Sequence, residues 1–131
     1  MINRDIFKLS IIIPCYNEKN TIENILKRID QSLKDNKFSK FEIIIVDDFS
    51  NDGTKQILKN LTSDEKLKIF FHDKNQGKGA AIHTALSNTT GDITIIQDAD
   101  LEYDPSDYNK LLVPFFETNA DIVYGSRFLG G

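Results

Sequence analysis

The chain has 131 residues, with 16 lysines and arginines against 20 aspartates and glutamates, so its formal net charge is −4. This size suits one soluble domain with its own core, and the acidic balance argues against a nucleic-acid-binding protein because few basic side chains are left to neutralise phosphates. A single cysteine excludes an intramolecular disulfide and a cysteine-based zinc site, and it is typical of a reducing, cytoplasmic location. The apolar runs are far shorter than the roughly 20 residues that span a bilayer.

Short segments rich in β-branched residues recur along the chain at intervals of about 30 residues, which is the size of a βαβ unit. The predicted strands cover 9–13, 41–46, 67–71, 93–97 and 122–124. The first two contain continuous apolar runs rather than an alternation of apolar and polar residues. Such runs are typical of parallel strands that are covered on both faces.

Segments with helical periodicity lie between these strands. Asn20 is the predicted N-cap of the first helix, with Glu23 three residues later, and Thr54 can cap the second. Pro114 is expected to kink or end the last helix. The predicted helices cover 22–33, 54–61, 79–87 and a segment that begins after Pro105.

This alternation of strands and helices predicts an α/β fold, a mostly parallel, doubly wound sheet with helices on both faces. In such sheets ligands bind at the carboxyl ends of the strands, so the loops that follow the strands form the candidate site. No internal repeat, low-complexity tract or linker divides the chain, and we interpret residues 1–131 as one domain.

The first two of these loops combine an aromatic side chain with acidic ones. Pro14 is expected to end the first strand, and Tyr16 then presents a ring with a polar tip. Cys15 is expected to fill a tight position rather than to act as a nucleophile, since no histidine lies nearby in the sequence. Asp47 and Asp48 are adjacent and point in opposite directions, so only one can face a given ligand. A capped turn and a solvated acidic turn are the structural alternatives for these loops.

The third loop places glycines and a lysine before a predicted helix, which suggests phosphate binding at a helix N-terminus. It is not a P-loop, because His72 stands where the first glycine belongs and Gly79 stands where serine or threonine should follow Lys78. No glycine-rich dinucleotide motif follows the first strand either. His72 and His83 lack the spacing of metal ligands, and we expect both to be structural.

The fourth loop carries the most specific signal. In an extended chain Asp98, Asp100 and Glu102 project to one side. Convergent carboxylates are costly without a counter-charge, and a hard divalent cation with oxygen ligands is a natural one. The spacing is not that of an EF-hand. The pattern therefore indicates Mg²⁺ or Mn²⁺ held together with the phosphates of a ligand, and a solvated acidic loop is the alternative.

Five segments, in order along the chain, resemble the motifs of family 2 glycosyltransferases, and most closely those of polyprenyl-phosphate (dolichol-phosphate) hexosyltransferases. They are Pro14-Cys15-Tyr16-Asn17-Glu18, the run from Val46 to Thr54, the run from Asn75 to Ala80, Asp98-Ala99-Asp100-Leu101-Glu102, and Gly125-Ser126-Arg127-Phe128. The match extends over nearly the whole chain. One departure is Phe49, which stands where glycine is commoner.

The resemblance implies a GT-A fold, a nucleotide-sugar donor and a divalent metal, Mg²⁺ or Mn²⁺. The positions that match the donor-binding residues are Pro14, Tyr16, Glu18, Val46, Asp48, Lys78, Asp98, Ala99 and Asp100. The metal ligands implied in the same way are Asp98, Asp100 and Glu102. The catalytic roles fall to Asp100 and to Arg127, which is expected to meet the phosphate of an acceptor lipid.

The activity implied is inverting transfer of a hexose from UDP-glucose or GDP-mannose to a polyprenyl phosphate at a membrane surface. Two alternatives remain open at this point: a family 2 transferase that glycosylates a hydroxyl of a glycan or lipid, and a non-catalytic nucleotide-binding fragment. Because family members usually continue through an acceptor-side region, we expect this chain to be the N-terminal, donor-binding portion of a longer enzyme. That enzyme is expected to work at the cytoplasmic face of the membrane.

Overall fold

The computed structural model describes residues 7–61, 63–99, 104–108, 112 and 122–125. Within these residues the centre is a five-stranded sheet in the order β3-β2-β1-β4-β5, and all neighbouring strands are parallel. The strands are β1 (Leu9–Cys15), β2 (Phe41–Asp47), β3 (Leu67–Phe71), β4 (Ile93–Gln97) and β5 (Ile122–Gly125). The predicted parallel sheet is confirmed.

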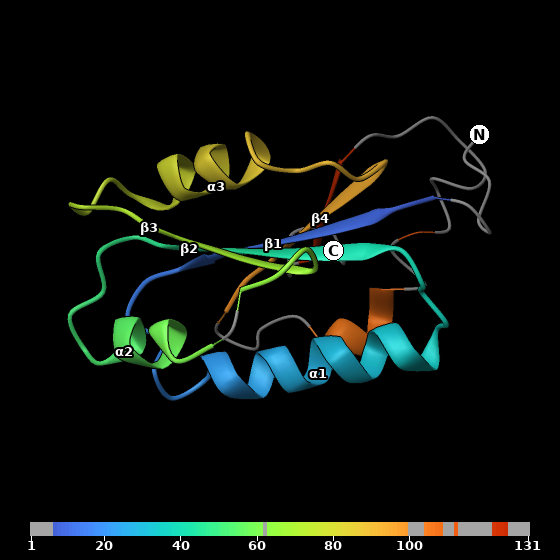
Figure 1. Cartoon of the computed structure of the whole chain (residues 1–131), viewed down its shortest axis with the longest axis horizontal. Helices are drawn as coiled ribbons and strands as arrows, with labels where there is room; N and C mark the ends of the chain where they lie inside the picture. Colours follow the sequence, from blue (N-terminus) through green and yellow to red (C-terminus); the bar gives the residue numbers. More distant parts are fainter. Residues whose placement is uncertain (1–6, 62, 100–103, 109–111, 113–121, 126–131) are drawn as a thin grey trace.

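Helices cover both faces of this sheet, as Figure 1 shows. α1 (Ile22–Asp35) and α2 (Thr54–Lys59) lie on one face, α3 (Lys78–Leu86) lies on the other, and the short 3-10 helix η1 (Pro105–Asp107) packs against α1. Successive residues of a strand point to opposite faces. Ile11 therefore packs with Ile25 of α1, whereas Ile12 packs with Ala81 of α3. This double covering explains the continuous apolar runs within β1 and β2.

The order of the strands predicts where in the sheet a ligand can bind. The chain runs outward from β1 through β2 to β3 and then returns to the other side of β1 as β4. The direction of winding thus reverses between β1 and β4, and ligands of doubly wound sheets bind outside the carboxyl ends of the strands at such a point. Tyr16 follows β1 and Asp98 follows β4, so two of the predicted loops meet there.

Pro14 does not end the first strand, contrary to the prediction. The pairing with β2 continues through Pro14 opposite Val46 and Cys15 opposite Asp47. The Cys15 carbonyl accepts a hydrogen bond from the Asp48 N–H, on the β2 side. Pro14, one residue earlier, faces the β4 side, where pairing ends at Ile12 opposite Ile96. A missing N–H is tolerated there because no neighbouring strand needs it.

Two capping predictions were wrong. The N-cap of α1 is Thr21 rather than Asn20, and the Thr21 hydroxyl bonds to Glu18. Thr54 is the first residue of α2 rather than its cap, because Gly53 takes the N-cap position with a φ of 107°. The Asp52 carboxylate accepts from the N–H and the hydroxyl of Thr54 and so does the work expected of a cap.

The predicted kink at Pro114 lies outside the described residues. Tyr108 and Leu112, from the expected fourth helix, are both fully buried in the core on the α1 side of the sheet. Among the described residues, no helix has both the length and the apolar character needed to cross a bilayer.

Candidate functional site

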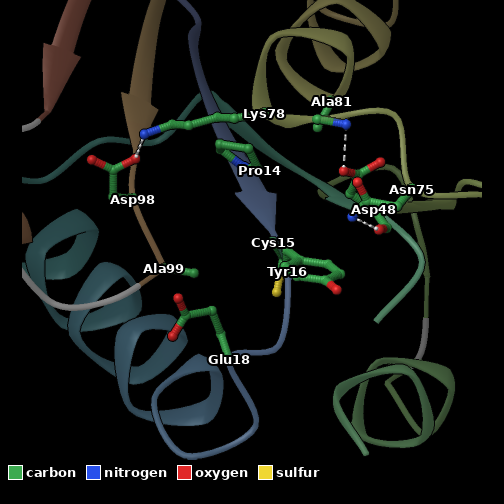
Figure 2. A pocket seen from close by; sticks show the side chains of 11 residues that line it. Pro14, Cys15, Tyr16, Glu18, Asp48, Asn75, Lys78, Ala81, Asp98 and Ala99 are labelled. Carbon is green, nitrogen blue, oxygen red and sulfur yellow. Dashed lines mark hydrogen bonds and ion pairs between the residues drawn. The ribbon is translucent and has the colours of Figure 1, made fainter. Parts of the chain in front are cut away.

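A pocket of about 370 Å³ opens where β1, β2 and β4 end and α3 begins (Figure 2). Its volume lies within the range of small-molecule sites. The walls come from four loops that are far apart in the sequence. The lining residues are Pro14, Cys15, Tyr16, Glu18, Asp48, Asn75, Gly77, Lys78, Ala81, Asp98 and Ala99.

Lys78 and Asp98 form an ion pair across this pocket. Lys78 is the first residue of α3, and its ammonium reaches the Asp98 carboxylate at the end of β4, with Nζ 2.5 Å from Oδ1 (Figure 2). The Lys78 side chain is 55% exposed, whereas that of Asp98 is 10% exposed. A cation that is more than half exposed is thus paired with a largely buried anion.

Asp48 is held as an anion by donors from the third loop. Its Oδ1 accepts from His72 Nδ1 at 2.8 Å and from the Gln76 N–H at 2.9 Å, and its Oδ2 accepts from the Gly77 N–H at 2.8 Å. Burial by itself raises the pKa of Asp48, but these three hydrogen bonds outweigh it and lower the pKa below its ordinary value. A carboxylate in this setting is a fixed hydrogen-bond acceptor at neutral pH.

His72 connects this carboxylate to α3. Its Nε2 lies 2.8 Å from the hydroxyl of Thr84, in the second half of that helix. The side chain is almost buried, as expected of a structural histidine. Because His72 bonds to Asp48, it also helps to position a residue of the pocket. The spacing of the histidines in the sequence did not indicate this role.

Asp47 points away from the pocket, as the alternation along the strand requires. It is fully buried, and its carboxylate accepts from the N–H and the hydroxyl of Ser50. The Ser50 hydroxyl also accepts from the Asn17 N–H at 2.9 Å, and Asn17 Oδ1 accepts from the Asn51 N–H. The prediction that only one of the two acids faces the pocket is confirmed, and the other one fixes the first two loops to each other.

The first loop supplies an aromatic and an acidic side chain. Tyr16 is 45% exposed in the pocket, a position from which a ring can stack against a flat ligand. The Glu18 carboxylate accepts from the Thr21 hydroxyl at 2.8 Å, and the Glu18 N–H donates to Thr54. These bonds anchor the loop on both helices of that face.

Cys15 contributes volume rather than reactivity. Its side chain is 1% exposed, and burial, followed by the negative charges of Asp47, Glu18 and Asp52, raises the pKa of the thiol far above its ordinary value. Since the thiolate is the nucleophilic form, a thiol in this position is inert. The expectation of a non-catalytic cysteine agrees with this geometry.

The structure brings seven of the predicted donor-binding residues into one pocket. They are Pro14, Tyr16, Glu18, Asp48, Lys78, Asp98 and Ala99. Val46 instead lies fully buried among Ile12, Ile44 and Ala81, beneath the pocket rather than in its lining. Asp100, Glu102 and Arg127 lie outside the described residues, so their predicted roles stay predictions.

Four lining residues were not among the predictions: Cys15, Asn75, Gly77 and Ala81. Gly77 has a signal in the sequence, because it precedes a helix in a glycine-rich loop and adopts a φ of 96°, which favours glycine. Asn75 donates to the Asp48 carbonyl at 3.2 Å, and this partner 27 residues away is visible only in the fold.

The described part of the chain contains no group of three metal-ligating side chains. It does contain Asp98, whose oxygen atoms are of the kind that Mg²⁺ and Mn²⁺ prefer. The Lys78 ammonium stands directly in front of one of these oxygens, which shows that the position accommodates a cation. The residue present therefore fits a divalent metal, and the two other predicted ligands lie beyond the described residues.

Comparison with known proteins identifies the family. The family described as Glycosyl transferase family 2 matches residues 10–131. The chain belongs to this family. A solved relative is the mannosyltransferase PcManGT of Pyrobaculum calidifontis, in complex with GDP-Man and Mn²⁺, with 33% identity and a TM-score of 0.66 over 77% of this chain and 30% of that one. The GT-A fold implied by the resemblance is thereby confirmed.

Two curated members of glycosyl transferase family 2 are similar over most of this chain. A dolichol-phosphate mannosyltransferase of Pyrococcus furiosus is 34% identical over 95% of this chain and 34% of its own length. An undecaprenyl-phosphate 4-deoxy-4-formamido-L-arabinose transferase of Aeromonas hydrophila is 32% identical over 86% of this chain and 35% of its own length. The chain thus spans about a third of the length of these relatives.

Proposed function

We propose that this chain carries the donor-binding site of an inverting hexosyltransferase that uses a nucleoside-diphosphate sugar and a polyprenyl phosphate acceptor. The observation that carries the proposal is the pocket at the carboxyl edge of the sheet, where residues from four loops converge. It combines an exposed ring, a fixed carboxylate acceptor and a cation at a helix N-terminus. These are the groups that a base, a ribose and a diphosphate need.

The Asp48 carboxylate supports uracil as the base. A carboxylate offers about four acceptor positions, and three described donors already occupy three of them. One position on Oδ2 is left, which suits the single imide N–H of uracil. Guanine presents two adjacent donors and needs two acceptors side by side. UDP-glucose is accordingly the first donor to test, and GDP-mannose is the second.

Lys78 and the first turn of α3 supply the groups for the diphosphate. The N-cap of α3 is Gly77, which has no side chain to cap the first turn, and its own N–H donates to the Asp48 carboxylate. Asp98 would hold Mg²⁺ or Mn²⁺ together with Asp100 and Glu102. When bound, the metal would stabilise the negative charge that develops on the leaving diphosphate.

The acceptor is proposed to be a polyprenyl phosphate, which is the kind of acceptor named in both curated relatives. A phosphate monoester is largely ionised at neutral pH, since its second pKa is about 6. One of its oxygens attacks the anomeric carbon as the bond to the diphosphate breaks, and a single displacement of this kind inverts that carbon. No general base is needed, whereas a sugar hydroxyl would require one. Arg127 is proposed to orient the acceptor phosphate.

Calorimetric titration with UDP and with GDP, each with and without Mn²⁺, tests the donor site. We expect UDP to bind with Mn²⁺ present and GDP to bind more weakly. If neither nucleotide binds, the proposed function is wrong. Transfer from UDP-glucose to undecaprenyl phosphate, followed by NMR of the product, tests the acceptor and the stereochemistry. Transfer only to a glycan hydroxyl, or retention of configuration, would contradict that part of the proposal.

A further inference from the structure

The ion pair between Lys78 and Asp98 crosses the pocket that we assign to the donor. Lys78 belongs to α3, on one face of the sheet, and Asp98 directly follows β4. The pair therefore links the start of α3 to the carboxyl end of the sheet (Figure 2). The Lys78 ammonium thus occupies the place in front of a carboxylate that the proposed function assigns to a metal ion.

We propose that Lys78 is a built-in counter-ion for Asp98 that a metal must displace, and that the donor diphosphate draws it away. Metal and diphosphate then bind cooperatively, and each binds weakly alone. The inference rests on the proposed function for the identity of the ligands. It goes further by giving Lys78 opposite effects on two binding events.

The burial of Asp98 explains why a counter-ion is needed. Its side chain is 10% exposed, and an anion with so little solvent is unfavourable unless a cation or donor accompanies it. A metal ion arriving alone meets this carboxylate already neutralised. It also meets a neighbouring positive charge, which repels it strongly at such short distances. Metal binding in the absence of nucleotide is therefore opposed by Lys78.

The exposure of Lys78 explains how the competition is relieved. Its side chain is 55% exposed and flexible, so its ammonium can move while Asp98 stays in place. A diphosphate beside the first turn of α3 offers the ammonium a new anionic partner, and the N–H groups of that turn favour the same anion. The Asp98 carboxylate then becomes available to the metal without leaving either cation unpaired.

The experiment compares wild-type protein with Lys78→Met in two titrations. In the first, Mn²⁺ is added alone and its binding is measured by electron paramagnetic resonance. In the second, UDP is added in saturating Mn²⁺ and its binding is measured by calorimetry. We expect Lys78→Met to bind Mn²⁺ alone about tenfold more tightly than wild type, and to bind UDP with Mn²⁺ about tenfold more weakly, as for loss of one charge-assisted hydrogen bond. Lys78→Arg keeps the charge and should stay within a few-fold of wild type for Mn²⁺ alone.

Lys74→Met is the matched control. Lys74 is an exposed lysine of the same loop and lies outside the pocket lining, so its replacement removes the same net charge at a similar position. We expect it to leave both affinities near wild type. If Lys74→Met tightens Mn²⁺ binding as much as Lys78→Met does, the effect is general electrostatics and the inference is wrong.

The two titrations separate this inference from the proposed function. If wild type binds UDP with Mn²⁺ but Lys78→Met binds Mn²⁺ alone no more tightly than wild type, Lys78 is not a competing counter-ion and the inference is overturned. If wild type binds neither nucleotide, the proposed function is wrong, and so is the part of the inference in which a diphosphate draws Lys78 away. The titration with Mn²⁺ alone still tests whether Lys78 competes with a metal for Asp98.

Discussion

Glu42 and Asp98 are buried acids at opposite edges of the sheet, and they differ in the number and the exposure of their described partners. At the amino-terminal edge, Glu42 of β2 is fully buried, and its carboxylate bonds to Ser10 of β1, to Thr90 before β4 and to Lys68 of β3. At the carboxyl edge, the carboxylate of Asp98 bonds to Lys78, a partner that is more than half exposed. Only the second arrangement leaves a partner that a ligand can replace.

This difference separates a group that holds the fold from one that we propose to bind a ligand. The bonds of Glu42 tie four strands or their connections together within the described residues, and they lower its pKa to about 2 although burial alone raises it. Donors on every side fix this carboxylate. Among the described residues, Asp98 is instead neutralised by one long side chain across a pocket, so its environment can change when a ligand enters.

Removing the acid at the amino-terminal edge should have the largest effect on stability. Glu42→Ala leaves the Ser10 hydroxyl and the Thr90 N–H without their acceptor and leaves Lys68 without its partner. We expect the free energy of unfolding to fall by about 4 kcal/mol, as for other broken buried pairs, measured by urea denaturation. If the variant does not fold, Glu42→Gln keeps the shape and should cost less. A change below 1 kcal/mol in both would show that this cluster does not hold the edge together.

Acid should destabilise the protein through the same group. The pKa of Glu42 is about 2 in the folded protein and 4.5 as its ordinary value, so the stabilisation is complete above about pH 4.5 and is lost as the pH falls toward 2. The difference corresponds to about 3 kcal/mol. Denaturation midpoints measured between pH 6 and pH 2.5 should fall steeply in wild type and less steeply in Glu42→Gln. The lowered pKa of Asp48 acts in the same direction and remains in the variant.

Removing the exposed ring at the carboxyl edge should affect binding and not stability. Tyr16 is 45% exposed, so Tyr16→Ala should change the free energy of unfolding by less than about 0.5 kcal/mol. The loss of a stacking surface for the base should weaken UDP binding in Mn²⁺ about tenfold, which calorimetry measures. Equal UDP affinity in wild type and variant would remove Tyr16 from the base site, and a large loss of stability would contradict the division between the two edges.

The carboxyl edge was largely predictable from the sequence because its geometry follows from strand periodicity. Once β1, β2 and β4 are recognised as parallel strands, the residues that follow them must meet at one edge. The alternation along β2 also predicts that the side chains of Asp47 and Asp48 point in opposite directions. Phe49, which departs from the motif pattern, adopts a φ of 65° in the turn after β2, a conformation that glycine accepts without strain.

The cluster of Glu42 with Ser10, Thr90 and Lys68 at the amino-terminal edge could not be predicted from the sequence, for a physical reason. Glu42 sits next to a run of four apolar residues, and a lone acid at that position resembles an ordinary exposed strand end. Its partners Ser10 and Thr90 are 32 and 48 residues away, and nothing in their spacing marks them as a set. The register of three adjacent strands decides that they meet.

For this protein, the pattern of apolar runs was enough to predict a parallel α/β sheet and the edge where the pocket lies, because periodicity and turn chemistry are local properties of the chain, and the resemblance of the loop motifs indicated the family. Only the tertiary structure decided which side chains share a partner there. Lys78 contacts Asp98, and His72 bonds to Asp48, because α3 packs on β1 and β2 with its first turn near the carboxyl ends of the strands. Contacts of this kind depend on how whole helices and strands are placed relative to one another. The packing of the core determines that placement, and the local sequence does not encode it.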